Sequence, residues 1–378
     1  MKYAIYISGC DGYNFITSIP YDQTRYPGQS AMIITRTPLR VCLGGGGTDV
    51  KEYYERFGGY VVSAAINQYI YVVIHNSFDR SLRICYSKRE IVERADDVHH
   101  PVVREAMKLF DITDRGIEII SFADIASDTG LGSSSSFTVA LVAALAAYKG
   151  VRMTRYEMAE MACHIERDIL KEAGGKQDQY IAAFGGILAL ILEPSGKVVV
   201  SPVQISNESI ELLEENILLF YTGIRRNSFK VQRALVRGLR KQKRTVDNLH
   251  EIKRLGFDTE EMLRNGNVNR YVNLLKEHWR AKQQLSEMIT NGRVTRLYEQ
   301  AMANGAEGGK LIGAGGGGYL LFYCSDPIKR EQLRRTMSQE GLEETRYTFD
   351  FTGVTVLAND GKPNKKGNSQ YLAQQGVS

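Results

Sequence analysis

The stretch that decides the fold is Asp128-Thr129-Gly130-Leu131-Gly132-Ser133-Ser134-Ser135-Ser136, a glycine loop that leads directly into four serines. An uncharged run rich in Ala, Leu and Val follows at 137–148, which predicts a buried helix that ends before Gly150. Glycines let a backbone approach a ligand closely, and a helix N-terminus attracts anions through its free N–H groups and its dipole. Residues 130–136 therefore predict a phosphate site, although serines beside glycines also serve as ordinary caps and turns.

Two common nucleotide-binding loops do not fit this stretch. No Gly-Lys-Ser/Thr follows the glycines, so the loop is not a Walker A motif. The glycine spacing and the residues that precede it also differ from the dinucleotide-binding fingerprint. A phosphate loop of another kind is expected.

Composition limits the class of protein. The 378 residues are enough for two ordinary domains, and 43% hydrophobic with 24% charged residues is typical of a soluble globular protein. The formal net charge of +5 suits a small anionic substrate and does not indicate a nucleic-acid partner. No apolar run is long enough to span a membrane, and no signal peptide is recognisable. The five cysteines are scattered and form no CxxC pair, which predicts reduced thiols and a cytoplasmic protein.

Changes in pattern along the chain predict its organisation. We interpret residues 1–31 as an N-terminal extension of unknown role, because a clean strand pattern begins only at Met32. The expected parts that follow are an N-terminal domain at 32–201, a C-terminal domain at 202–358 and a polar tail at 359–378. A strand at 346–356 is expected to close the C-terminal domain.

Two helical stretches have clear local signals. Thr154 and Glu157 form the pattern of a capping box, which predicts a helix from there to about Glu172. The stretch 228–254 is rich in Arg and Lys, and such a run usually forms the solvated face of a helix.

A second glycine-rich stretch follows the first predicted strand. It contains four consecutive glycines at 44–47, and each would weaken a regular element by about 1 kcal/mol relative to alanine. Such a run is expected where the backbone turns sharply or touches a ligand. The hydroxyl and carboxylate that follow can accept hydrogen bonds from sugar hydroxyls, so we predict a sugar-binding segment made of Gly45, Gly46, Gly47, Thr48 and Asp49. The alternative is that Asp49 caps a helix at 50–57.

A third glycine-rich stretch lies at 308–318, just before a strand pattern at 319–324. Together, the segment from Pro38 to Asp49, the loop at 130–136 and the run at 312–318 resemble the three motifs of the GHMP small-molecule kinases, in the same order. The resemblance covers roughly residues 32–356. It implies an α+β fold with two domains, an S5 domain 2-like N-terminal domain and a ferredoxin-like C-terminal domain, with ATP and substrate between them.

The resemblance also implies roles for individual residues. Gly130, Leu131, Gly132, Ser133, Ser134, Ser135 and Ser136 would hold the ATP phosphates. Ser134, with Ser133 or Ser135 as the neighbouring choices of register, and Glu166 would hold Mg²⁺. Asp178 resembles the catalytic aspartate, acting either as a base or as an orienting anion. Arg40 would stabilise charge near the transferred phosphoryl group and also the carboxylate form of Asp178, which favours the orienting role.

The first motif departs from the galactokinase form, because it has Gly-Thr-Asp where that form has a histidine before the aspartate. It is more similar to the branch that phosphorylates O1 of manno-heptose 7-phosphate, which makes a precursor of GDP-heptose for surface glycans, with fucose kinases as relatives. The implied partners are ATP and a small sugar phosphate, with a homodimer as one assembly to test. The implied substrate contacts include Gly315 and Gly316, and a second phosphate pocket made of Lys176, Arg225 and Arg226. A kinase of an unphosphorylated sugar such as fucose, or a non-catalytic sugar and ATP sensor, are the alternatives.

Overall fold

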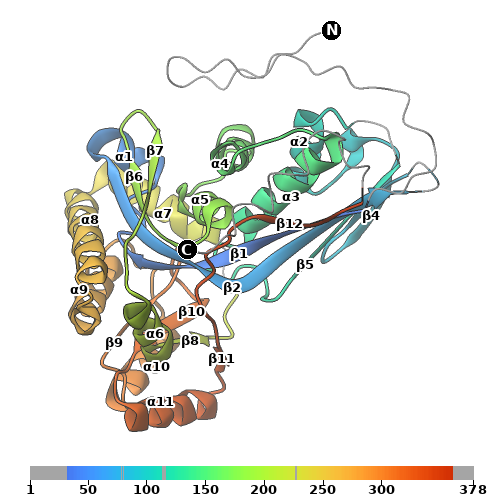
Figure 1. The fold of residues 1–378 in the computed structure, drawn as a ribbon. Coiled ribbons are helices and arrows are strands. Elements are labelled where there is room, and N and C mark those ends of the chain that lie inside the picture. The colour runs from blue at the N-terminus through green and yellow to red at the C-terminus, as the bar shows by residue number, and fades with distance from the viewer. Residues whose placement is uncertain (1–31, 78, 80, 113–115, 226–227, 361–378) are drawn as a thin grey trace, which may run out of the picture.

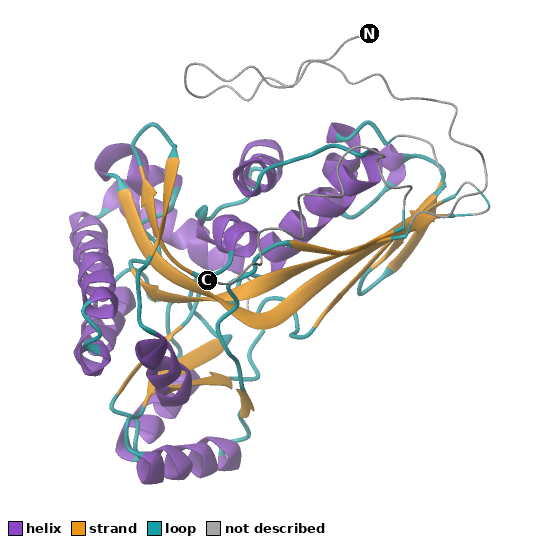
Figure 2. Ribbon diagram, in the orientation of Figure 1, coloured by secondary structure: helices purple, strands orange, loops and turns teal. Residues whose placement is uncertain are grey.

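The computed structural model describes residues 32–77, 79, 81–112, 116–225 and 228–360. The N-terminal extension at 1–31, Arg226 and residues 361–378 of the predicted tail lie outside these residues. Two sheets, each covered by helices, make up the described chain, which confirms the expected α+β class (Figure 2).

The larger sheet is built around two long strands, β1 (Ile33–Gly44) and β2 (Gly59–Asn76). Strand β2 pairs with two strands along one edge: its first half pairs with β6 and its second half pairs with β5. The strand order is β12-β1-β2-β5-β3-β4, and β6 and β7 extend from the first half of β2. The remaining strands of this part are β3 (Leu82–Cys85), β4 (Arg89–Val92), β5 (Ile117–Ala123), β6 (Ile187–Leu192) and β7 (Val198–Pro202).

Helix α3 (Ser133–Lys149) is the buried helix predicted from its composition. It packs on β1 and β2 on one side and on other helices on the other, so an apolar surface all round is what its position requires (Figure 1). Gly150 ends it in a left-handed conformation, as predicted. The other helical elements of this part are α1 (Lys51–Phe57), η1 (Ala95–Asp97), α2 (Pro101–Leu109), α4 (Arg155–Cys163), η2 (His164–Ile169) and α5 (Gln177–Phe184).

The smaller sheet has the order β11-β8-β10-β9 and is antiparallel throughout. Its strands are β8 (Ile217–Tyr221), β9 (Gly308–Leu311), β10 (Tyr319–Tyr323) and β11 (Glu343–Thr345). The basic stretch at 228–254 forms two helices instead of one, with a break at Gln242. The helical elements here are α6 (Asn207–Asn216), α7 (Ser228–Lys241), α8 (Lys243–Arg264), η3 (Val268–Arg270), α9 (Tyr271–Gln283), α10 (Gly292–Ala303) and α11 (Pro327–Gln339).

The expected strand at 346–356 is wrong. A turn interrupts it, because the Asp350 carboxylate accepts hydrogen bonds from the backbone N–H groups of Thr352 and Gly353, and Gly353 has a φ of 69°. The strand that follows, β12 (Thr355–Asn359), does not join the smaller sheet and instead pairs with β1 (Figure 1). The end of the chain therefore returns to the N-terminal sheet.

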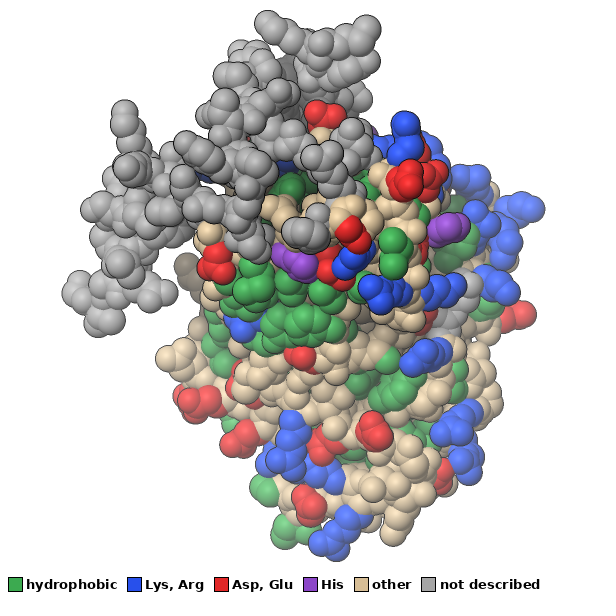
Figure 3. Space-filling model, turned by 90° about the vertical axis from the view of Figure 1, so that its right-hand side faces the viewer, with side chains coloured by type: hydrophobic (Ala, Val, Ile, Leu, Met, Phe, Trp, Pro, Cys, Tyr) green, Lys and Arg blue, Asp and Glu red, His purple; other side chains and the backbone are tan. Residues whose placement is uncertain are grey.

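Two further features of the described chain concern the length of its helices and the side chains on its surface. Among the residues that the structure describes, no helix combines the length and apolarity needed to cross a membrane. The face seen in Figure 3 carries acidic and basic side chains interspersed with each other, beside a cluster of hydrophobic side chains.

Candidate active site

The predicted phosphate loop lies at the start of α3. Gly132 is the residue before the helix, with a φ of 85°, and Gly130 has a φ of 91°, so both adopt the left-handed conformation that favours glycine. Within the loop, the side chain of Ser134 is exposed, whereas Ser136 is buried and donates a hydrogen bond to the carbonyl of Pro38 at 2.9 Å. The loop thus has the geometry of an anion site, and Ser136 holds it against β1.

Glu166 lies in η2, a π-helical segment that follows α4 directly. The capping box of Thr154 and Glu157 is confirmed, but the predicted helix to Glu172 is wrong, because α-helical geometry ends at Cys163. The wider π turn buries Glu166 to 1% exposure, and such segments often occur at functional sites.

The carboxylate of Glu166 faces the serine loop. Its Oε2 accepts hydrogen bonds from Ser135 Oγ at 2.9 Å and from Gln179 Nε2 at 2.7 Å, and it lies 3.3 Å from Arg167. Its Oε1 is buried and has no hydrogen-bond partner among the described residues. The serine that donates to Glu166 is therefore Ser135, one position along from Ser134, and Oε1 is left available to a cation.

Arg40 and Asp178 form a two-pronged ion pair. Arg40 Nε lies 2.7 Å from Asp178 Oδ1, and Nη2 lies 2.9 Å from Oδ2. Burial opposes the charge of Arg40, but the nearby Asp178 carboxylate more than offsets it and raises the pKa of the guanidinium. Arg40 Nη1 also donates to the carbonyl of Gly130 at 2.6 Å, and a Cβ on Gly132 would lie 3.3 Å from both side chains. The pair and the phosphate loop are thus in direct contact.

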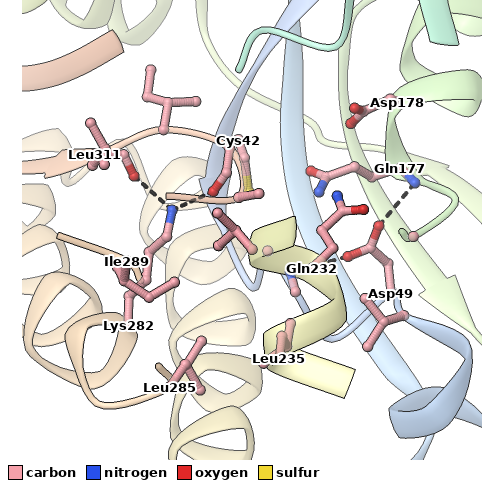
Figure 4. A pocket seen from close by; sticks show the side chains of 18 of the residues that line it. Cys42, Asp49, Gln177, Asp178, Gln232, Leu235, Lys282, Leu285, Ile289 and Leu311 are labelled. Atoms are coloured by element: carbon pink, nitrogen blue, oxygen red, sulfur yellow. Dashed lines mark hydrogen bonds between the residues drawn. The ribbon is translucent and has the colours of Figure 1, made fainter. Parts of the chain in front are cut away.

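Asp49 is not a helix cap. Helix α1 begins at Lys51, and the residue before it is Val50. Instead, the buried carboxylate accepts hydrogen bonds from the backbone N–H groups of Gly47 and Gln177, both at 3.1 Å (Figure 4). Burial raises the pKa of Asp49, and the Gln177 hydrogen bond partly counters this. Gly175 is required beside it, because a Cβ there would lie 1.7 Å from Oδ2.

These groups line a pocket between the two parts of the chain. Asp49, Gln177 and Asp178 lie on one side of it, and Lys282, Leu285 and Ile289 lie on the other (Figure 4). Gly46 and Gly47 also line this pocket, as predicted for substrate contacts. The pocket therefore joins a charged wall from the N-terminal part, which carries Asp49 and Asp178 with Arg40 and Arg167, to a second wall from the C-terminal part.

The second wall contains a group that we call the basic cluster: His278, Lys282 and Lys310. All three side chains are buried and line the pocket. Burial lowers the pKa of Lys310 to about 8, and burial together with the two lysines lowers the pKa of His278 well below its usual range. Sequence reasoning missed this cluster, although a lysine inside the buried pattern at 308–312 is an available signal.

Several predicted substrate contacts are placed elsewhere. Lys176 donates to Glu160 at 3.0 Å and to the Gly196 carbonyl at 2.9 Å, and does not line the pocket. Thr48 bonds to the carbonyls of Gly45 and Tyr60, so its hydroxyl holds the loop together. Gly45 itself lets the chain pass Tyr60, since a Cβ there would lie 2.0 Å from that carbonyl oxygen.

The third glycine motif contributes to the pocket through Gly313 and Ala314, not through the predicted Gly315 and Gly316. The N–H of Gly316 donates to the Ile289 carbonyl at 2.7 Å, and a Cβ on Gly315 would meet Ile289 at 2.9 Å. These two glycines therefore pack against the segment after α9. Arg225 is exposed and does not line the pocket.

A glycine–serine loop at a helix N-terminus, an Arg–Asp pair in contact with it and a pocket between the two parts of the chain are features expected of a small-molecule kinase. The family model for the GHMP kinase N-terminal domain matches residues 98–186, and the model for the C-terminal domain matches residues 260–343. The chain belongs to the GHMP kinase family.

Within the family, the chain is similar to kinases named for sugars and sugar phosphates. The chain is 31% identical to the D-glycero-alpha-D-manno-heptose 7-phosphate kinase of Campylobacter jejuni, over 85% of this chain and 98% of that protein. It is 24% identical to the bifunctional fucokinase/GDP-fucose pyrophosphorylase of Arabidopsis thaliana, over 80% of this chain but only 31% of that protein. A solved structure of a D-glycero-D-manno-heptose 1-phosphate kinase from Bacteroides thetaiotaomicron superposes with a TM-score of 0.72 at 24% identity, covering 86% of this chain and 99% of that one.

Proposed function

We propose that this chain is an ATP-dependent sugar-phosphate kinase that phosphorylates O1 of D-glycero-α-D-manno-heptose 7-phosphate and releases the 1,7-bisphosphate, a precursor for the GDP-heptose of surface glycans. The observation that carries the proposal is the match to the Campylobacter jejuni kinase over nearly the whole length of both chains. The contact of Arg40 with Asp178 and with the predicted phosphate loop, beside the pocket, supports it. Because ATP is the donor, the proposed setting is the cytoplasm.

The reaction forms a bond between O1 and the γ-phosphorus of ATP and breaks the bond between that phosphorus and the β,γ-bridging oxygen, so ADP leaves. Catalysis of this kind depends mainly on positioning and charge stabilisation. Asp49 accepts hydrogen bonds from sugar hydroxyls, and Asp178 contacts the reacting hydroxyl. Both oxygens of Asp178 already accept from Arg40, which supports an orienting role in which the O1 proton leaves to solvent as the O–P bond forms.

We propose that Mg²⁺ accompanies ATP and is held by Glu166 with a serine of the loop. Bound Mg²⁺ would neutralise charge on the β- and γ-phosphates. The bare, buried Oε1 of Glu166 fits this role, because Mg²⁺ prefers oxygen ligands. Within the described residues, no group of three or more His, Cys, Asp or Glu side chains is arranged to hold a metal. That fits an ion that takes most of its ligands from substrate phosphates and water.

The test is ADP release from Mg-ATP with four acceptors: D-glycero-D-manno-heptose 7-phosphate, mannose, fucose and galactose. We expect turnover only with the 7-phosphate. Turnover with a plain sugar and not with the 7-phosphate would overturn the assignment and favour the second candidate, a fucose kinase, which the fucokinase relative supports. Binding of both ligands without any ADP release would favour a sensor. The assembly state, including the homodimer, is open to light scattering on the same sample.

A further inference from the structure

The second wall of the pocket holds two buried positive charges. Lys282 is 8% exposed, and its ammonium group donates to the carbonyls of Leu311 at 2.7 Å and Gly313 at 2.6 Å (Figure 4). Lys310 is 1% exposed and donates to the carbonyl of Leu43 at 2.7 Å and to His278 Nδ1 at 2.8 Å. Both of the Lys310 acceptors are neutral. Because taking an ammonium group out of water costs several kcal/mol, a buried ammonium group of this kind at a pocket wall suits an anionic ligand.

His278 supplies an independent sign that a ligand belongs here. An ammonium group has only donors, so His278 Nδ1 must accept from Lys310, and the ring proton of the neutral imidazole must lie on Nε2. The side chain is 4% exposed and lines the pocket, yet Nε2 has no hydrogen-bond partner among the described residues. A buried N–H without an acceptor costs about 1–3 kcal/mol. The missing acceptor is expected to come from the substrate.

We propose that the basic cluster of His278, Lys282 and Lys310 binds the phosphate group that the sugar already carries, far from the hydroxyl that reacts. The proposal rests on the proposed function, and it replaces the predicted pocket of Lys176, Arg225 and Arg226. A phosphate offers several acceptors and a negative charge to ammonium and N–H donors. The ATP phosphates have a different site, because none of the loop residues 130–136 lines this pocket.

The arrangement of the two walls gives the substrate a direction. The carboxylates of Asp49 and Asp178 lie on one side of the pocket and Lys282 lies on the other (Figure 4). In the proposed complex the sugar hydroxyls face the carboxylates and the phosphate faces the basic cluster. Arg40 already pairs with Asp178, but a reversed sugar would still place its phosphate near the buried carboxylate of Asp49, which like charge disfavours. The cluster would therefore select a phosphorylated sugar and also decide which of its hydroxyls meets ATP.

The kinetic test compares Lys282→Met with Lys276→Met. Lys276 lies on the same helix, α9, but its side chain is exposed and does not line this pocket, so it is a matched control. The measured quantity is the ratio of kcat/KM for heptose 7-phosphate to kcat/KM for the unphosphorylated heptose. We expect this ratio to fall about 10- to 100-fold in Lys282→Met, mainly through KM, since a hydrogen bond to a charged group contributes about 1.5–3 kcal/mol. The control should keep the wild-type ratio. An equal loss on both sugars would show that Lys282 is only structural and would overturn the proposal.

A binding measurement separates this inference from the proposed function. Inorganic phosphate is titrated into the full chain in a calorimeter, with Mg²⁺ and a saturating non-hydrolysable ATP analogue so that the phosphate loop is occupied. We expect binding to the wild type and to Lys276→Met, and loss of at least tenfold in affinity in Lys282→Met. If this pattern holds while no sugar is turned over, the proposed function fails and the phosphate site stands. If the 7-phosphate is turned over but Lys282→Met binds phosphate as the wild type does, the phosphate site fails alone.

Discussion

Replacing Asp178 with Asn should remove activity while leaving the protein folded. Arg40 is 5% exposed in its side chain and Asp178 is 22% exposed, so the guanidinium is the buried partner of the pair. Removing one partner of a fully buried pair costs about 3–5 kcal/mol. Asn keeps the shape and one acceptor, and Asp178 is partly in water, so we expect a loss of about 1–3 kcal/mol in the free energy of unfolding. At about 2–4 °C per kcal/mol, we expect Tm to fall by roughly 2–12 °C.

The effect on catalysis should be much larger than the effect on stability. A group that positions the reacting hydroxyl or takes its proton contributes about 10²- to 10⁴-fold to the rate, and we expect kcat to fall within this range. The assay is ADP release, with Tm and the Kd for ATP measured on the same preparation. Asp168→Asn is the control, because Asp168 is 60% exposed and, among the described residues, its ion-pair partner is His164. An Asp178→Asn variant that keeps more than about a tenth of the wild-type kcat would refute the reasoning.

Three further changes test other parts of the site. Glu166→Gln keeps the shape but removes the charge beside the bare oxygen, so the Mg²⁺ concentration for half-maximal activity should rise about tenfold or more; an unchanged Mg²⁺ titration would sink the metal assignment. Gly318→Ala should cost several kcal/mol in chemical denaturation and weaken ATP binding, because its φ is 89° and the new Cβ would lie 2.1 Å from the Thr129 carbonyl oxygen. Gly150→Ala, with a similar φ and nothing within 4 Å, should cost only about 1–2 kcal/mol, and equal losses would contradict the packing argument. Lys310, whose pKa is lowered to about 8, faces the pocket together with Arg40, Cys42, Lys282 and His278, and it loses its positive charge as the pH rises through that value. KM for the sugar phosphate should therefore rise several-fold between pH 8 and pH 9 in the wild type. A Lys310→Met variant that keeps the same rise would show that another group is responsible.

Local signals in the sequence predicted the parts of the site that local chemistry controls. The apolar run at 137–148 predicted a buried helix that Gly150 ends, and the structure confirms this helix but begins it at Ser133. Thr154 with Glu157 marked a helix start that the structure confirms. Where the backbone geometry depends on tertiary packing, prediction failed. The π turn that buries Glu166 has no marker in the residues 164–169. The serine that donates to Glu166 is Ser135, one of the register choices that the loop sequence left open.

Long-range placement explains the remaining errors. Lys176 sits beside Asp178 in the sequence, but the start of α5 turns it toward Glu160 and away from the pocket. Conversely, Lys310 is 270 positions from Arg40 and faces the same pocket, because β9 lies beside the first glycine run. The motifs predicted a kinase through their resemblance to a family, whereas the basic cluster could be found only once the fold placed its residues at one pocket.

The carbonyl of Leu43 connects these two walls. It accepts hydrogen bonds from Lys310 Nζ at 2.7 Å and from the hydroxyl of Tyr271 at 3.1 Å, and both donors come from the C-terminal part of the chain. Leu43 immediately precedes the glycine run that leads to Asp49, so the segment that binds the hydroxyl end is held by the residue that we assign to the phosphate end. A phosphate that accepts a hydrogen bond from the Lys310 ammonium group would therefore affect the hydrogen bond between Lys310 and the Leu43 carbonyl. Substrate selection and the position of Asp49 are therefore coupled, because the Lys310 ammonium group contributes to both.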